Sequence, residues 1–587
     1  MLLTRFGGEI MNTFKMLKRL LKYARGYRLI LFIAFIGAIL YASSILLAPK
    51  IIGEAIDYFI DKGSFDMDRF LEVIYMLLII VICGAIFGFI MDYLLNKVTY
   101  SMVLELRRDA FRKVLKVKIK YLDEMSEGDL LQRIINDTNQ VSDGLLQGFK
   151  QSLMGVITII VTLIMMFIIK WELGLIVFFL TPISLFVAKF VANRSYKTFK
   201  AQAEIKGEMN AFLDEMITNQ KMVISYQMEK RNIDKFMEID KRLYYAGRDS
   251  QFSSSLTNPS TRFVNALVYA ICATVGAIFI INNPLAGFGI GGLTAFLAYA
   301  SQYTKPFNEL SSVHTELSNS FASLKRVFEL IDEVELVEEN NNLPKLEGNV
   351  VFSDVSFSYT DNPLIKNVNL NIKKGQHVAI VGPTGCGKTT LINLIMRFYD
   401  SNSGSISIDD YDITKYSRKS LRENIGMVLQ DTWIFNGTVY DNIAFGKENA
   451  SLDEVIDAAK RAYADDFIMH LSNGYDTYLT SSSSISEGEK QLICIARLML
   501  KKPEILILDE ATSNIDTRLE LNIQSAFKAL MEGHTSFIIA HRLSTIRNSD
   551  IILVMKDGNI IETGRHEELL KKKGFYYELY NSQYNEE

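Results

Sequence analysis

The sequence predicts a membrane all-α domain of six helices followed by an α/β domain. The chain has 587 residues, which is too long for a single hydrophobic core. Hydrophobic residues make up 49% of it and the mean hydropathy is +0.13, a high value for a chain with 22% charged residues. Long apolar segments occupy residues 1–310, whereas short β-rich runs alternate with helical patterns over residues 345–587.

Charge and cysteine usage narrow the class of protein. The net charge of −4, from 63 basic and 67 acidic residues, gives no reason to expect a nucleic-acid partner. Cys83 and Cys272 lie in apolar runs, while Cys386 and Cys494 lie in the polar half. This distribution indicates no disulfide framework, which suits a C-terminal half in a reducing cytosol.

Six apolar segments are each close to the ~20 residues that a helix needs to cross a bilayer. The stretches VIYMLLIIVICGAIFGFI and SLMGVITIIVTLIMMFII are the clearest. The sixth segment contains Gly, Ser, Gln and Thr throughout, so a buried helix of a soluble domain is a stronger alternative there. The expected spans are residues 29–48, 71–95, 152–170, 174–193, 263–282 and 288–307.

Charges at the ends of these segments predict their orientation. Six basic residues lie between positions 15 and 28, just before the first span, so the N-terminus is expected in the cytoplasm. The next loop holds four aspartates and is expected outside, whereas residues 96–151 and 194–262 are rich in Lys and Arg and are expected inside. Six spans then place both termini in the cytoplasm of a multi-pass cell-membrane protein. The first apolar run is long and lacks a small-residue cleavage site, unlike a signal peptide.

The order of segments predicts four parts. Residues 1–28 are basic and amphipathic and are expected to lie on the membrane surface as an elbow, with a plain solvated lead-in as the alternative. Residues 29–310 form the six-span domain, 311–348 a linker and 349–587 the α/β domain. The two long cytosolic excursions are expected to be span helices that continue into the cytosol and return. Their tips are expected near Tyr121–Gly128 and Ala211–Gln220, in contact with whatever lies below the membrane.

The strongest motif is VAIVGPTGCGKTTLINLI. An apolar run at His377–Val381 predicts a buried strand, and the eight residues Gly382–Thr389 match G-x-x-x-x-G-K-[ST] in full before a helical pattern. The glycines let main-chain N–H groups surround phosphate oxygens, Lys388 reaches the β- and γ-phosphates, and Thr389 ligates Mg²⁺. The motif predicts a P-loop NTPase domain. Its expected nucleotide-binding residues are Gly382, Thr384, Gly385, Cys386, Gly387, Lys388, Thr389 and Thr390.

A second apolar run ends in two carboxylates. In EILILDE, four apolar residues predict a buried strand that ends at Asp509 and Glu510. Asp509 suits the Mg²⁺ shell, directly or through water, and Glu510 can polarise the attacking water as a general base. A pair of capping carboxylates is the alternative. Beside the glycine-rich loop, the pair predicts nucleotide hydrolysis.

The order of these motifs resembles that of an ABC transporter nucleotide-binding domain. Over nearly the whole chain, the six spans and long cytosolic helices resemble the bacterial ABC exporter family. The resemblance implies that Tyr359, in VSFSYTDN, stacks on adenine. It implies that Gln430, in MVLQDTWIFNGTV, senses the γ-phosphate, takes part in the metal shell and contacts the membrane domain.

The resemblance extends to two further motifs. The stretch Ser513–Asp516 resembles the D-loop, which implies that Asp516 lies at the nucleotide. The histidine of FIIAHRLST, His541, resembles the switch histidine that contacts the γ-phosphate, although a lone histidine is more often structural. Together with Glu510 and Gln430, His541 completes the implied catalytic set.

The family architecture implies a dimer. A half-transporter carries one membrane domain and one nucleotide domain, and two ATP molecules lie between two nucleotide domains. Each ATP is held by the phosphate loop of one chain and the signature turn of the other. The implied activity is ATP hydrolysis with Mg²⁺, coupled to alternating access of the spans to the two sides of the membrane.

The signature turn departs from the family pattern. The stretch ISEGEKQ aligns with L-S-G-G-Q-x-Q, so Ser486 and Gly488 are kept, while Glu487 and Glu489 replace a glycine and a glutamine. A carboxylate a few ångström from a phosphate costs on the order of 1 kcal/mol or more. In a homodimer both ATP sites would receive this altered signature, and the full catalytic set of the chain would then have no intact site to act in. We therefore favour a heterodimer with a second ABC half-transporter that has a normal signature. A homodimer that tolerates both changes stays open.

The sequence says little about the cargo. Its 22 methionines and 36 phenylalanines suit an adaptable apolar cavity, but such residues also face lipid or fill cores. Asp92, in FIMDYLLNK, is a candidate substrate or gating contact, with plain snorkelling as an equal alternative. By resemblance, we expect multidrug-type extrusion of small hydrophobic or amphipathic compounds from the lipid bilayer. The alternatives are a lipid flippase, a dedicated peptide exporter and, less favoured, an ATP-gated channel or sensor.

Overall fold

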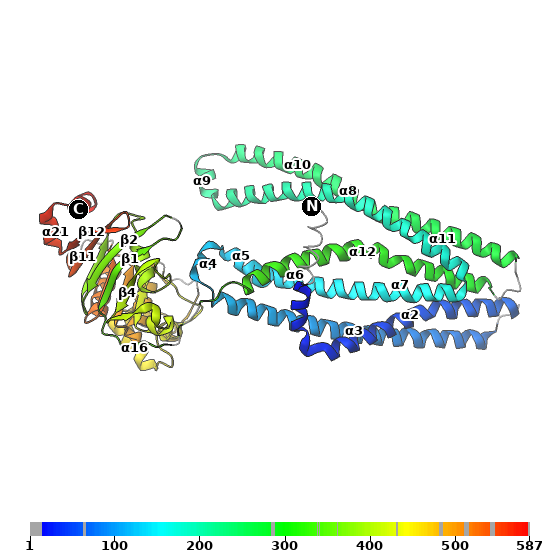
Figure 1. The fold of residues 1–587 in the computed structure, drawn as a ribbon, viewed down its shortest axis with the longest axis horizontal. Coiled ribbons are helices and arrows are strands. Elements are labelled where there is room, and N and C mark those ends of the chain that lie inside the picture. The colour runs from blue at the N-terminus through cyan, green and yellow to red at the C-terminus, as the bar shows by residue number, and fades with distance from the viewer. Residues whose placement is uncertain are drawn as a thin grey trace. The chain divides into compact units, whose positions relative to one another are not determined.

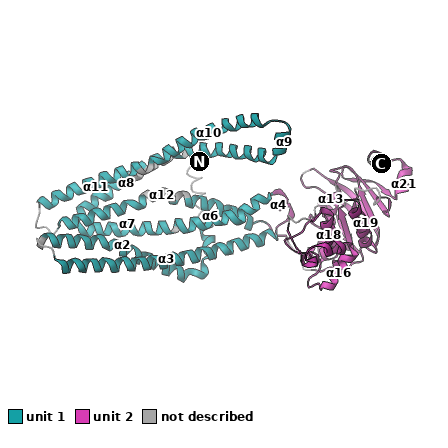
Figure 2. Cartoon of the chain, turned by 180° about the vertical axis from the view of Figure 1, so that it is seen from behind, with its two compact units in different colours: residues 1–116, 125–333 teal, residues 117–124, 334–587 magenta. Residues whose placement is uncertain are grey.

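The computed structural model describes residues 15–62, 66–282, 288–336, 339, 341–360, 362–429, 432–480, 485–509, 516–540 and 546–584. These residues divide into two compact units, coloured separately in Figure 2. One comprises the described residues up to Lys116 together with Met125–Glu333, and the other comprises Val117–Glu124 and the described residues from Val334 onward. A short segment from the helical half of the chain therefore belongs to the C-terminal unit.

The first unit is built from long helices (Figure 1). A helix over residues 15–23 leads through the 3-10 turn η1 (Arg25–Tyr27) into the remaining helices. The polypeptide between residues 127 and 169 is one continuous helical run that includes the π-helical turns η2 and η3. The helices are α2 (Arg28–Lys62), α3 (Met67–Val114), α5 (Glu127–Leu131), η2 (Gln132–Asn136), α6 (Asp137–Gly144), η3 (Leu145–Phe149), α7 (Lys150–Ile169), α8 (Trp171–Thr218), α9 (Gln220–Ser225), α10 (Glu229–Ser255), α11 (Thr257–Asn282) and α12 (Ile290–Ile331).

Four helical stretches of the described residues are long and apolar enough to cross a membrane. They are Arg25–Ile60, Met67–Val114, Glu127–Ile169 and Glu229–Asn282, and a shorter apolar stretch, Trp171–Ile183, begins α8. The six predicted spans fall, to within two residues, on α2, α3, α7, α8, α11 and α12. The helical character of the predicted membrane domain is thus confirmed, and the number of six crossings stays a prediction.

Helices α2 and α12 approach each other closely at two glycines. A Cβ added to Gly291 would lie 1.9 Å from the main-chain oxygen of Gly53, so both positions exclude a side chain. One turn further along α2, the Asp57 carboxylate accepts the N–H groups of Gly291 and Gly292 at 2.7 and 2.9 Å. It thereby satisfies donors in the first turn of α12 that have no partner within the helix.

The second unit contains two larger sheets and one strand pair. One sheet is antiparallel, in the order β2-β1-β4-β5, and the other has the order β12-β11-β3-β10-β9-β6. Within the latter, β11, β3, β10, β9 and β6 are parallel, and β12 is antiparallel at the edge. The strands are β1 (Val350–Phe357), β2 (Ile365–Ile372), β3 (His377–Val381), β4 (Ser403–Ile408), β5 (Tyr411–Asp412), β6 (Ile425–Val428), β7 (Gly437–Thr438), β8 (Tyr478–Leu479), β9 (Ile505–Asp509), β10 (Thr535–Ile539), β11 (Ile551–Lys556) and β12 (Asn559–Gly564).

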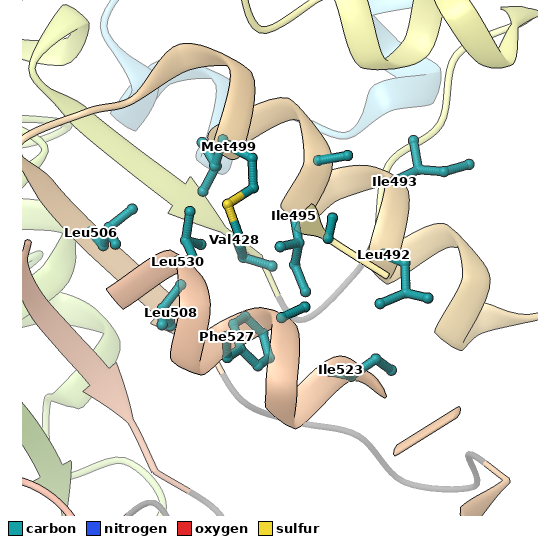
Figure 3. Close-up of a cluster of buried hydrophobic side chains, with 14 of the residues drawn as sticks. Val428, Leu492, Ile493, Ile495, Met499, Leu506, Leu508, Ile523, Phe527 and Leu530 are labelled. Atoms are coloured by element: carbon teal, nitrogen blue, oxygen red, sulfur yellow. The ribbon is translucent and has the colours of Figure 1, made fainter. Parts of the chain in front are cut away.

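Helices cover these sheets and create two hydrophobic cores. In β9, Leu506 and Leu508 belong to the core beneath α18 and α19 (Figure 3), whereas Ile505 and Ile507 belong to the core that includes α13. A strand buried on both faces needs apolar residues at every position, which explains the continuous run ILIL. The helices of this unit are α4 (Ile119–Glu124), α13 (Lys388–Ile395), η4 (Ile413–Lys415), α14 (Arg418–Glu423), α15 (Val439–Ala444), α16 (Leu452–Arg461), α17 (Asp465–His470), η5 (Gly474–Asp476), α18 (Glu487–Lys501), α19 (Thr517–Met531), α21 (His566–Lys572) and α22 (Phe575–Tyr584).

Candidate functional site

The parallel sheet brings two predicted motifs to one edge. Strand β3 ends immediately before the glycine-rich loop, and β9 ends at Asp509. Strand β10 lies between them, with Ile539 in register with both Ile380 and Asp509. Because the carboxyl ends of parallel strands meet at the same edge, the loop and Asp509 lie one strand apart, where open α/β sheets bind ligands.

The loop backbone requires its glycines. Gly382, Gly385 and Gly387 have φ values of +154°, +80° and +103°, in the region that favours glycine. A Cβ on Gly382 would lie 2.3 Å from the main-chain oxygen of Met555, and one on Gly387 would lie 2.8 Å from Ile365. The loop therefore turns sharply from β3 into α13, which begins at Lys388.

The side chains of the loop divide into exposed and buried ones. The Lys388 ammonium donates to the main-chain oxygens of Gly382 at 2.7 Å and Pro383 at 3.0 Å, so it lies folded over the loop. Thr384 and Thr389 are exposed. Cys386 and Thr390 are buried, and burial raises the pKa of the Cys386 thiol. These two residues can therefore offer a nucleotide their main-chain N–H groups more readily than their side chains.

The donor set fits Mg²⁺. The exposed Thr389 hydroxyl at the start of α13 and the Asp509 carboxylate at the end of β9 are oxygen donors, the kind this ion prefers. Among the described residues there is no cluster of three or more His, Cys, Asp or Glu side chains that would hold a metal by itself. This agrees with Mg²⁺ sites in nucleotide enzymes, where one or two protein ligands are completed by phosphate oxygens.

Tyr359 belongs to an aromatic cluster. Its ring meets Phe357 and Tyr399 edge-on, with centroids 4.8 and 4.9 Å apart, and its hydroxyl accepts a hydrogen bond from Asn393 of α13 at 3.2 Å. The Tyr399 hydroxyl donates in turn to Asp123 of α4. The segment at the first predicted tip is thus connected through Tyr399 to the residue implied to stack on adenine.

Sequence reasoning did not identify Tyr399, and it included Asp123 in the first predicted tip without giving this residue a role. No local pattern marks their pairing, because it joins positions 276 residues apart.

The altered signature forms the N-terminus of α18, with Ser486 as the N-cap. Ser486 and Glu489 form a capping box, in which each side chain bonds to the other residue's main-chain N–H. The Glu487 carboxylate accepts hydrogen bonds from Lys490 at 2.6 Å and Thr432 at 2.9 Å, and its side chain is 71% exposed. These bonds hold the pKa of Glu487 below its usual range. Both carboxylates therefore have partners within their own chain.

The phosphate loop and the signature belong to different cores. Cys386 and Leu391 lie in the core that includes α13, whereas Ile485 and Leu492 lie in the core beneath α18 and α19. Asp516 is an exposed residue at the N-cap of α19, without a side-chain capping bond. The predicted residues that lie outside the described part of the chain are Gln430, Glu510, His541 and Ser513, Asn514 and Ile515.

A glycine-rich loop between a buried parallel strand and a helix, beside a strand that ends in an aspartate, defines a P-loop nucleotide-binding domain joined to a helical membrane domain. The family model of the ABC transporter transmembrane region matches residues 31–307, and the ABC transporter model matches residues 365–513. With the relatives described next, these matches show that the chain belongs to the ABC transporter family, as one half-transporter with both domains.

Three relatives illustrate the range of the family. An uncharacterised ABC transporter ATP-binding protein of Bacillus subtilis is 38% identical, covering 97% of this chain and 94% of that protein. A fatty acid ABC transporter ATP-binding/permease protein of Mycobacterium bovis is 42% identical, over 83% of this chain and 77% of that protein. An ATP-dependent lipid A-core flippase of Syntrophus aciditrophicus is 33% identical, over 99% and 96%. The chain is therefore a membrane protein that binds ATP and couples its hydrolysis to transport.

Proposed function

We propose that this chain pairs with a different ABC half-transporter and extrudes hydrophobic or amphipathic compounds by alternating access. We call this dimer of two different half-transporters the asymmetric pair. The observation that supports it is the contrast among the motifs of this chain. The phosphate loop, the Asp509–Glu510 pair and His541 follow the family pattern, whereas the signature turn carries carboxylates at positions 487 and 489. One site of the pair then uses this chain's catalytic groups and a normal partner signature, and the other binds ATP but turns over slowly.

In the hydrolytic site, the residues have separate roles. Lys388 and the N–H groups of the loop hold the phosphates, and Thr389 and Asp509 supply protein oxygens for Mg²⁺, with Gln430 completing the shell. The bound ion neutralises charge on the phosphates. Glu510 orients and deprotonates the attacking water, and His541 contacts the γ-phosphate.

Tyr359 stacks on the adenine, and Asp516 lies near the bound nucleotide. Ser486 and Gly488 contact the nucleotide that the partner chain binds.

Two features support a nucleotide-binding interface that needs a second chain. The phosphate loop and the signature lie over separate cores of one unit.

In the first unit, the second hairpin turns at α9, just beyond the tip predicted at Ala211–Gln220. This turn exposes large apolar side chains, among them Ile217, Met222, Ile224 and Tyr226. Such a cluster on a cytosolic tip is typical of a surface that another protein covers. Both termini and both tips lie on the cytoplasmic side in this proposal, where the tips pass closure of the nucleotide domains to the spans.

Lipid translocation is the second candidate, because two relatives carry names that refer to fatty acids and lipid A. In the structure Asp92 forms an ion pair with Lys150 of α7, with Nζ 2.7 Å from Oδ1. Lys150 also lines a cavity of about 250 Å³ whose walls include Leu20, Val98 and Met102. A cavity whose walls are apolar apart from Thr99 and the Lys150 ammonium suits an amphipathic molecule.

The test is reconstitution of the full-length chain with its partner in lipid vesicles. ATP-dependent movement of a hydrophobic dye, lost with Glu510→Gln in this chain, supports extrusion of small compounds. Movement of a fluorescent fatty acid or phospholipid without the dye favours the second candidate. Purification of the chain only as a complex of two identical copies contradicts the asymmetric pair.

A further inference from the structure

The hydroxyl of Ser486 is already engaged within its own chain. It donates its hydrogen to Oε2 of Glu489 at 2.8 Å and accepts the main-chain N–H of Glu489 at 3.3 Å. The main-chain N–H of Ser486 donates to the same carboxylate oxygen at 2.7 Å. A serine hydroxyl has one hydrogen, so in this arrangement it has none left for another acceptor.

The side chain at position 489 decides which way this hydrogen points. An ionised carboxylate only accepts hydrogen bonds, so the Ser486 hydroxyl must donate to it. A glutamine amide can donate to the hydroxyl oxygen instead, and it still completes a capping box, because Glu and Gln both serve at this position. With an amide, the hydroxyl hydrogen becomes available to a phosphate oxygen.

The carboxylate at position 487 has a different environment. It accepts hydrogen bonds from Lys490 and Thr432, so the ammonium of Lys490 compensates its charge locally. No hydrogen bond joins Glu487 to Ser486 among the contacts of the described residues. The two substitutions that distinguish this signature are therefore not equivalent.

From these contacts we infer that Glu489, not Glu487, is the residue that keeps this signature from holding a phosphate. It acts as a positioning residue: it draws the Ser486 hydroxyl hydrogen onto its own carboxylate and so withholds it from the γ-phosphate of a nucleotide on the partner chain. The inference rests on the function proposed above, in which Ser486 serves that nucleotide. The inference attributes the slow turnover at one of the two ATP sites to a single side chain.

The test compares two isosteric changes, Glu489→Gln and Glu487→Gln, in the full-length chain. Both remove one negative charge, so a general charge effect predicts similar results. Each is combined with Glu510→Gln and, in the partner complex, with the same exchange at the partner's catalytic glutamate, so that hydrolysis is blocked at both sites. The ATP retained after rapid removal of free nucleotide is then measured with the chain alone and with the partner complex. Glu489→Gln is expected to lower the ATP concentration for half-maximal retention roughly tenfold or more, the order expected for one added hydrogen bond to a charged phosphate. Glu487→Gln is expected to change it less than about twofold.

Adding Ser486→Gly to the Glu489→Gln variant supplies the control, because glycine removes the hydroxyl but is almost as favourable as serine at an N-cap. The gain must disappear if it depends on the released hydroxyl, whereas a gain from altered helix stability would persist. The inference is overturned if Glu487→Gln gives the larger gain, if Glu489→Gln gives none in either preparation, or if Ser486→Gly leaves the gain intact. The asymmetric pair is judged separately, from hydrolysis by the chain without Glu510→Gln, alone and with its partner.

Discussion

Replacement of Arg326 by methionine is expected to weaken the junction between α12 and α6. Both oxygens of Asp137 accept an N–H from the Arg326 guanidinium, at 2.8 and 2.6 Å. The Asp137 residue is only 1% exposed. Removing the guanidinium therefore leaves a buried carboxylate without its charged partner.

The size of the effect follows from this geometry. Removing one partner of a buried ion pair costs about 3–5 kcal/mol of folding stability, mainly because the remaining charge stays buried. The Arg326 side chain is 45% exposed, so water can approach the pair and screen it. We therefore expect Arg326→Met to lower the free energy of unfolding of the first unit by about 2–3 kcal/mol, below the full range for a buried pair.

The assay is thermal unfolding of the purified full-length protein in detergent. The double variant Arg326→Met, Asp137→Leu removes both charges and is expected to recover most of the loss. Arg242→Met is the matched control, because Arg242 pairs with Glu208 between two half-exposed side chains and should contribute at most about 1 kcal/mol. A loss for Arg326→Met no larger than that of the control, or a double variant as unstable as the single one, would refute the reasoning.

Three further predictions concern other contacts. Gly291→Ala places a Cβ 1.9 Å from a main-chain oxygen of α2 and should destabilise the protein by about 1–3 kcal/mol in thermal unfolding, whereas Gly207→Ala, with open space around its Cβ, should not destabilise it. Burial opposes ionisation of Asp409, but three main-chain N–H groups hold its pKa below the usual range. Asp409→Asn should therefore cost about 1 kcal/mol at pH 7, and this difference should vanish as the pH falls below about 4, through the lowered pKa; an unchanged difference in acid contradicts this. Tyr399→Phe removes the hydrogen bond to Asp123 and should speed amide exchange in α4 about fivefold, corresponding to about 1 kcal/mol; equal exchange rates would show that the bond does not hold α4.

Local patterns are sufficient to predict the strands and helices that carry the phosphate loop. The run His377–Val381 forms β3, and ILILD forms β9, because strands buried on both faces need unbroken apolar sequence. The apolar segments of the membrane domain likewise fall on helices, since a bilayer requires every main-chain group to be satisfied within its own segment. The matching family models confirm the predicted fold class.

Contacts between distant positions are not readable in this way. The segment Ile119–Glu124 belongs to the second unit, and no nearby motif marks the hydrogen bond that its Asp123 accepts from Tyr399. The signature is an intermediate case. The spacing of Ser486 and Glu489 is that of a capping box and is visible in the sequence, whereas the bond from Thr432 to Glu487 bridges 55 positions. The sequence shows that two carboxylates are present, and only the fold shows that each has a different partner.

The measurement that tests the account most directly is ATP hydrolysis by this chain purified alone in lipid, with Glu510→Gln as the blank. The asymmetric pair predicts activity no higher than the blank for the chain alone, and strong activity when a second half-transporter with a normal signature is co-expressed. Strong hydrolysis by the chain alone, lost in the blank, would contradict the account, because it would mean that a homodimer works with two carboxylate-bearing signatures.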